Sequence, residues 1–72
     1  MNRHHNKQTS TLWSGRVYVT YDRDKKGGNV CIDPLDDNEF IVLMYLPIDE
    51  INENGIREVL EYCGYNPDIW LK

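Results

Sequence analysis

The chain has 72 residues, of which 40% are hydrophobic and 11% aromatic, and a formal net charge of −4. This length suits one small domain and is too short for two separate cores, while the hydrophobic content is too high for a disordered chain. No apolar run approaches the roughly 20 residues that span a bilayer, and the polar start of the chain lacks the apolar stretch of a signal peptide. We therefore expect a cytoplasmic protein, located in the host cell if a virus encodes it.

The chain is expected to begin with a tail and a strand. Residues 1–10 contain one apolar side chain, that of Met1, which predicts a flexible polar tail and a single folded domain over residues 11–72. From Thr11 to Tyr21, apolar and aromatic side chains alternate between two faces, the pattern of a half-buried strand. Gly15 interrupts one of these faces, which predicts a bulge or a place where another side chain lies across the backbone.

Two further strands are expected after a hairpin. The segment Asp22–Asn29 is made of charged and turn-forming residues with a glycine pair, which predicts a turn followed by a second strand at Val30–Ile32. The turn-forming segment Asp33–Asn38 precedes the apolar run Phe40–Leu46, whose length, flanking turns and β-branched content favour a third strand over a short buried helix. Because the run does not alternate, we expect it to be buried on both faces. The sheet then needs a second cover, either the C-terminal segment or a second copy of the chain in a homodimer.

The apolar spacing changes to three and four residues after Pro47, which indicates one amphipathic helix. The residues that repeat at this interval are Ile48, Ile51, Ile56, Val59, Leu60 and Cys63. Asp49 is a suitable N-cap for this helix, and Gly64 is a suitable end. Gly55 predicts an alternative in which a short turn precedes a helix that starts at Asn54.

The C-terminal segment is short. Asn66–Asp68 begins either one helical turn or an extended tail, and Trp70 is expected to return to the core. The assembled prediction is an α+β domain in which a three-stranded antiparallel β-meander is followed by one amphipathic helix packed on the sheet, in the order β-β-β-α, with a short C-terminal tail. Cys31 and Cys63 lie far apart in sequence, and a reducing cytoplasm favours two free thiols.

Charge is divided sharply along the chain. Residues 1–29 contain six basic and two acidic residues, a net charge of +4, whereas residues 30–72 contain two basic and ten acidic residues, a net charge of −8. A rigid acidic surface steers basic partners and repels nucleic acid. The candidate protein-binding residues lie in the loop after residue 32 and in the helix, and they are Asp33, Asp36, Asp37, Glu39, Glu53, Glu58 and Glu61. The alternative is a solvated surface that only keeps the protein soluble.

Protein binding is therefore the leading functional hypothesis. Carboxylates on a rigid scaffold can take the place of phosphates in the basic, nucleic-acid-binding site of another protein. By analogy of size and charge alone, the chain is similar to many inhibitors of host enzymes or defence complexes that phages and mobile elements encode, the anti-CRISPR type among them. An inhibitor or modulator of this kind should expose an apolar patch near Tyr45, Tyr65 or Trp70, and so should a structural subunit of a homo-oligomer or hetero-oligomer, which is a further alternative.

The first hairpin supports a different function, nucleic-acid binding. Cations there neighbour aromatic side chains, and such a mixture on a sheet can hold phosphates and stack bases. The residues of this alternative site are Arg16, Arg23, Lys25, Lys26 and Tyr18. Nucleic-acid binding requires the four cations to be exposed in one stripe. Because four cations make a small patch in a chain of net charge −4, nucleic acid ranks below a protein partner.

The sequence lacks the parts of a catalytic or metal site. The only histidines, His4 and His5, fall in the predicted tail, so no Ser, Thr or Cys has an oriented base beside it. The segment Asp22–Asp33 has the length of a calcium loop, but Lys26 occupies a ligand position, which makes a charged hairpin the better interpretation. We expect a non-catalytic protein that holds no cofactor and no metal.

Overall fold

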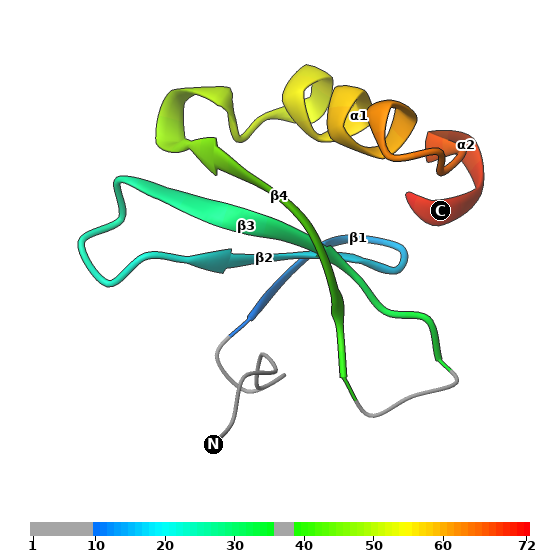
Figure 1. Ribbon diagram of the computed structural model, residues 1–72, viewed down its shortest axis with the longest axis horizontal. Coiled ribbons are helices and arrows are strands. Elements are labelled where there is room, and N and C mark those ends of the chain that lie inside the picture. Colours follow the sequence, from blue (N-terminus) through cyan, green and yellow to red (C-terminus); the bar gives the residue numbers. More distant parts are fainter. Residues whose placement is uncertain (1–9, 36–38) are drawn as a thin grey trace.

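The fold is an antiparallel β-sheet with a helix packed on one face (Figure 1). Over residues 10–35 and 39–72, which the computed structural model describes, the sheet has four strands paired in the order β1-β2-β3-β4. The elements are β1 (Thr11–Ser14), β2 (Val17–Tyr21), β3 (Gly27–Ile32), β4 (Ile41–Pro47), the 3-10 helix η2 (Ile48–Glu50), α1 (Glu53–Tyr62) and α2 (Pro67–Trp70). The predicted α+β class is confirmed, but the expected number of three strands is wrong. Of the predicted tail, residues 1–9 lie outside the described residues.

The additional strand arises at Gly15, where the expected single strand Thr11–Tyr21 turns back on itself. Gly15 has a φ of 56°, a left-handed conformation that favours glycine, and it lies in the tight turn that joins β1 to β2. A Cβ atom at this position would collide with the backbone carbonyl oxygens of Trp70 and Lys72. A segment therefore does lie across Gly15, but it is the C-terminal backbone rather than a side chain.

The β2–β3 hairpin confirms the predicted turn, which is shorter than expected. The Asp22 N–H donates to the Gly27 carbonyl oxygen (2.8 Å), and the Lys25 N–H donates to the Asp22 carbonyl oxygen (3.0 Å). β3 consequently begins at Gly27 rather than at Val30. This strand position requires glycine because the phenol of Tyr45 lies directly over it, where any Cβ atom would collide.

β4 lies at the edge of the sheet, which corrects the expected burial of the run Phe40–Leu46 on both faces. Within β4, Leu46 alone is buried, whereas Ile41, Val42 and Tyr45 are 42%, 41% and 48% exposed. Among the described strands, β4 pairs with β3 only, and α1 covers one face of the sheet. The apolar run is therefore buried at Phe40 and Leu46 and is half-buried or exposed between them.

The segment after Pro47 forms η2 and α1 instead of one helix that starts at Asp49. Asn52 is the N-cap of α1, because its side-chain oxygen accepts the N–H of Gly55 at 2.9 Å and so satisfies a donor of the first turn. Asp49 lies inside the preceding 3-10 helix and caps nothing. The predicted alternative, a short turn before a helix, is the better description, with Glu53 as the first helical residue.

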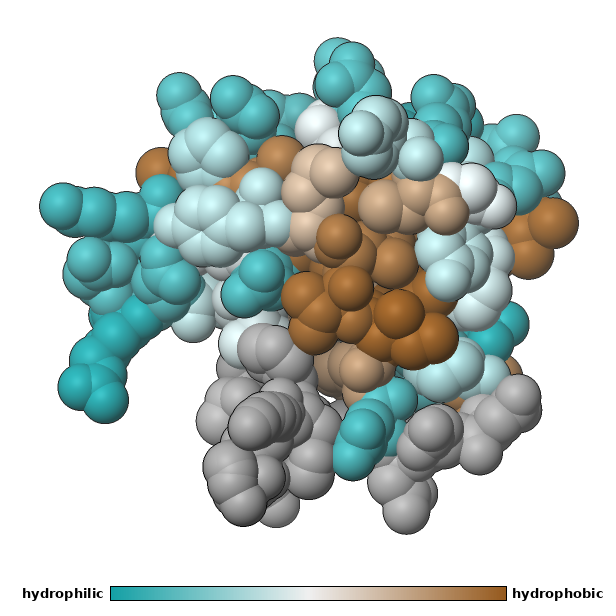
Figure 2. Space-filling model, in the orientation of Figure 1, coloured by the Kyte–Doolittle hydropathy of each residue, from teal (hydrophilic) through white to brown (hydrophobic). Residues whose placement is uncertain are grey.

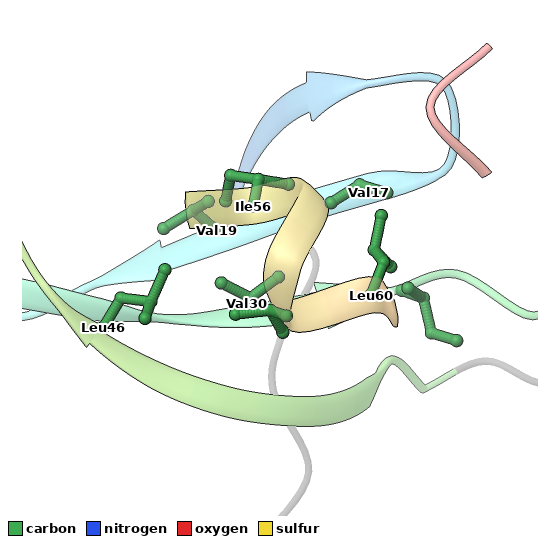
Figure 3. Close-up of a cluster of buried hydrophobic side chains, with 8 residues drawn as sticks. Val17, Val19, Val30, Leu46, Ile56 and Leu60 are labelled. Carbon is green, nitrogen blue, oxygen red and sulfur yellow. The ribbon is translucent and has the colours of Figure 1, made fainter. Parts of the chain in front are cut away.

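The core lies between α1 and the sheet (Figure 3). Alternate strand residues face one side and helix residues three or four apart share a face, so apolar side chains from both meet there. The buried cluster consists of Val17, Val19, Val30, Ile32, Leu46, Ile56, Val59 and Leu60. Figure 3 shows Ile56 and Leu60 of α1 facing the valines of β2 and β3. One apolar stripe on the helix thus fixes how α1 sits on the sheet.

The C-terminal segment docks on the β1–β2 turn. After one helical turn in α2, the Arg16 N–H donates to the Trp70 carbonyl oxygen (2.9 Å) and the Ser14 hydroxyl donates to the Leu71 carbonyl oxygen (2.7 Å). Trp70 is half-buried and packs against the core cluster, as predicted. The last residues therefore close one end of the core and do not cover β4.

Candidate protein-binding surface

A pocket of about 340 Å³ opens between β4 and α1. Alternation places two β4 side chains on its floor, and the helical spacing adds side chains from the neighbouring face of α1. The residues that line this β4–α1 pocket are Met44, Leu46, Glu50, Glu58, Val59 and Tyr62. Two acidic residues, Glu50 of η2 and Glu58 of α1, therefore line the pocket beside apolar residues, and Tyr62, which is 81% exposed, completes the lining.

The pocket belongs to a strongly acidic part of the molecule. Residues 48–62 contain five carboxylates and one arginine, a net charge of −4. We call the five carboxylates the acidic surface, and they are Asp49, Glu50, Glu53, Glu58 and Glu61. Its one cation, Arg57, is bound to Asp68 of α2 at 3.0 Å, and this hydrogen bond raises the pKa of the guanidinium. The charges of Glu53 and Glu61 also raise this pKa, so one cation is shared among several carboxylates and the segment keeps its net charge of −4.

The candidate acids of the sequence fall into two separate groups. Glu53, Glu58 and Glu61 are exposed together on α1. Asp33 is 8% exposed at the far end of β3, where its side-chain oxygen accepts the Leu35 N–H at 3.0 Å. Glu39 is exposed before β4, and Asp36 and Asp37 lie outside the described residues. The seven residues of β4, about 20 Å of extended chain, run between the loop acids and the helical acids.

Exposed apolar side chains occupy the space between these groups. Ile41, Val42 and Tyr45, which we call the hydrophobic strip, all belong to β4. Figure 2 shows a hydrophobic patch in the middle of the view, along the course of β4 in Figure 1. A patch was predicted near Tyr45, Tyr65 or Trp70, but the last two rings pack edge to face at 5.3 Å and are half-buried against the core. Of the three residues named in that prediction, only Tyr45 is therefore exposed.

The hydroxyl of Tyr45 ties the hydrophobic strip to the β2–β3 turn. It donates a hydrogen bond of 2.7 Å to Oδ2 of Asp22. This bond to a carboxylate raises the pKa of the Tyr45 phenol, and the charges of Asp22 and Asp24 raise it further. At neutral pH the phenol therefore keeps its proton and its donor role.

The candidate nucleic-acid residues are not brought together. Arg16 lies in the β1–β2 turn, where its Nε donates to the Asp33 carbonyl oxygen at 3.0 Å. The cations Arg23, Lys25 and Lys26 are exposed in the β2–β3 turn at the opposite end of β2. The ring of Tyr18 stacks on that of Phe40, with 4.5 Å between the ring centroids, on the face away from α1. The structure therefore separates the cations into two groups instead of one stripe.

The two thiols are free and lie on opposite sides of the sheet. Cys31 is buried and pairs with Tyr18 and Val42, so it faces away from α1, whereas Cys63 packs against the core cluster. Burial raises the pKa of the Cys31 thiol, while a hydrogen bond with Thr20 partly opposes this rise. Cys31 is thus held as a neutral, unreactive thiol at neutral pH.

Within the described part of the chain, no cluster of His, Cys, Asp and Glu could hold a metal ion. No helix there is long and apolar enough to cross a membrane.

Sequence reasoning identified Glu58 but not the rest of the pocket. Glu50, Met44 and Tyr62 were missed because their proximity depends on how α1 is rotated over β4. The available signal was a carboxylate next to an apolar strand and a tyrosine four residues after Glu58 on the predicted helix. Comparison of the chain with protein-family models, curated proteins and solved structures finds no match.

Proposed function

We propose that the chain is a small, non-catalytic protein-binding module that recognises a basic surface of a partner protein through its acidic surface. The observation that carries this proposal is the β4–α1 pocket, in which apolar side chains lie directly beside carboxylates. Apolar area supplies affinity at the centre of an interface, while charges around it set specificity and speed association. A purely solubilising set of carboxylates has no need of an open apolar pocket between its members.

The hydrophobic strip adds apolar area on both faces of β4, since Ile41 pairs with Ile32 on the face that α1 covers, whereas Val42 and Tyr45 lie on the opposite face. Ile41 and Val42 add exposed aliphatic area along β4, and Tyr45 adds an amphipathic ring of the kind enriched in interfaces. All these residues sit on strand and helix scaffolds. Little ordering entropy would be lost when a partner binds.

The partner class that suits this surface is a protein with a basic or nucleic-acid-binding site. Fixed carboxylates would occupy positions that phosphates take in that site, so the chain would act as an inhibitor or modulator of the partner. A phage or mobile-element inhibitor of a host or defence protein, including the anti-CRISPR type, is the biological form of this proposal. The proposal requires no chemistry from the chain itself.

Affinity capture with charge-neutral variants tests this function. The triple variant E53Q/E58Q/E61Q removes three exposed charges of α1, and R23Q/K25Q/K26Q removes three exposed charges of the β2–β3 turn as a matched control. Each is used as bait in lysate of the source organism at low and high salt, beside the wild-type chain. We expect one specific protein to be retained by the wild-type chain and the turn variant, and lost with the helix variant or at high salt. Equal capture by the helix variant would contradict the proposal, and recovery of nucleic acid that depends on the turn would favour the alternative site.

A further inference from the structure

We infer that the β4–α1 pocket is an anchor site for one arginine side chain of the partner protein. This inference rests on the proposed function and adds to it the chemistry of the group that is recognised. The pocket combines an apolar floor with two acidic residues and an exposed tyrosine, and the edge of β4 disfavours other occupants.

The floor of the pocket suits the stem of a long basic side chain. Met44, Leu46 and Val59 present apolar atoms, and the volume of about 340 Å³ lies in the range of pockets that hold a small ligand. Arginine and lysine carry methylene stems that pack on apolar surface while the charged end stays near water. A purely apolar side chain would fill the same floor but leave the neighbouring carboxylates without a counter-charge.

The polar lining selects arginine over lysine. Glu50 and Glu58 come from different elements, and within the described residues neither carboxylate accepts a hydrogen bond or forms an ion pair. A planar guanidinium can donate to two carboxylates at once and stack on an aromatic ring, whereas the compact ammonium of lysine cannot match both. Tyr62 lines the pocket and is 81% exposed, so its ring would be free to stack on a bound guanidinium.

Recognition through side chains is favoured because the backbone of β4 is a poor template for strand addition. The Ile48 N–H donates to the Lys26 carbonyl oxygen. Because backbone groups alternate in direction along an antiparallel strand, the backbone polar groups of Tyr45 and Pro47 then point away from β3, toward the open edge. Pro47 has no N–H to offer at this edge. The register shift leaves Leu43 without a partner on β3, which interrupts the ladder in the middle of the strand.

A second copy of the chain is also a poor occupant. In a two-fold symmetric dimer it would bring its own acidic segment, with a net charge of −4 over residues 48–62, close to an identical one. Like charges placed together at an interface oppose association. Charge repulsion thus disfavours a two-fold dimer through this pocket, and the occupant that we infer is a basic segment of a different protein.

The inference is tested with capped tripeptides and methyl NMR spectra of the protein. The peptides have glycine on both sides of arginine, lysine or citrulline, the neutral isostere of arginine. We expect the arginine peptide to shift the methyl signals of Met44, Leu46 and Val59, with the citrulline peptide bound about tenfold more weakly and the lysine peptide between them. Equal binding of the three peptides, or shifts confined to residues outside the pocket, would overturn the inference.

Two double variants with the same change in net charge separate the pocket from the general field. E50Q/E58Q removes the carboxylates that line the pocket, whereas E53Q/E61Q removes two carboxylates of α1 that do not. The first variant and Tyr62→Ala should abolish the preference for arginine over citrulline, and the second should retain it. If both double variants lost this preference equally, the pocket would not be the arginine site, while the proposed function would stand. The proposed function fails separately, if partner capture does not depend on the charges of α1.

Discussion

The guanidinium of Arg16 lies 4.1 Å from the centroid of the Trp70 ring, and the backbone N–H of Arg16 donates to the carbonyl oxygen of the same tryptophan. Arg16, near the start of the domain, is thereby bound to Trp70, near its end. The contact combines a cation–π interaction with a hydrogen bond that anchors the end of α2 to the β1–β2 turn. The C-terminal residues thus contribute to the stability of the sheet and lie away from the acidic surface.

Removing the Trp70 ring should destabilise the protein strongly for its size. Trp70→Ala loses the half-buried ring and the cation–π contact, and we expect the free energy of unfolding to fall by about 2 kcal/mol. Ile69→Ala, at the neighbouring and 61% exposed position of α2, should change it by less than about 0.5 kcal/mol. Urea denaturation measures both. A similar small effect for the two substitutions would show that the C-terminal segment does not close the core.

Two glycines with positive φ angles provide a matched test of the C-terminal docking. Gly15 has a φ of 56° and lies against the C-terminal backbone, whereas Gly64 has a φ of 88° and no atom within 4 Å of the position that a Cβ would take. Gly64→Ala should cost about 1 kcal/mol from backbone strain alone. Gly15→Ala should cost clearly more, because strain and collision add, and equal losses in denaturation experiments would contradict the docking.

The position of the helix N-cap gives a third prediction. Asn52→Ala removes the side-chain acceptor of the Gly55 N–H and should lower the free energy of unfolding by about 1 kcal/mol. Asp49→Ala should leave it nearly unchanged, because Asp49 forms no side-chain cap. Thermal or urea denaturation compares the two. A larger loss at Asp49 would favour the single long helix that the sequence alone predicts.

Tyr45 should titrate at a more alkaline pH than a free tyrosine. Its pKa is raised in the folded state, so the bond to Asp22 contributes stability that is complete below the ordinary tyrosine pKa and is lost as the pH rises through the folded value. Asp22→Asn removes the charge that raises the pKa and should return it toward the ordinary value. NMR titration of the Tyr45 ring in both proteins measures the change. An unchanged Tyr45 pKa in the Asp22→Asn variant would show that the bond is not formed.

Much of the fold follows from local sequence signals. The charged turn after Tyr21, the amphipathic period after Pro47 and the helix start at Asn66 each produce the expected element, because turn chemistry and apolar spacing act over a few residues. The β1–β2 turn escaped prediction for a physical reason. The register shift between Leu12 and Ser14 leaves Trp13 packed against the core. Core-facing side chains therefore fall at odd-numbered positions both before and after the turn, which is the pattern of one continuous strand.

The edge position of β4 and the pocket could not be predicted from local signals. A continuous apolar run is typical of a strand that is covered on both faces, so Ile41 and Val42 were expected to be buried. The run alone does not show whether the strand lies inside the sheet or at its edge, where both residues are exposed. The pocket depends on the rotation of α1 over β4, which is set by the packing of Ile56 and Leu60 on the sheet. Charge counting indicated Glu53, Glu58 and Glu61 because charge is a property of the sequence itself, but the candidate residues did not include Asp49 and Glu50.

Hydrogen exchange of the chain with and without its captured partner tests most directly whether the acidic surface and β4 bind that partner. Binding should slow exchange of amides in η2, α1 and β4, with little change in the β2–β3 turn. Protection confined to residues 22–26 of that turn, with η2, α1 and β4 unaffected, would contradict the account.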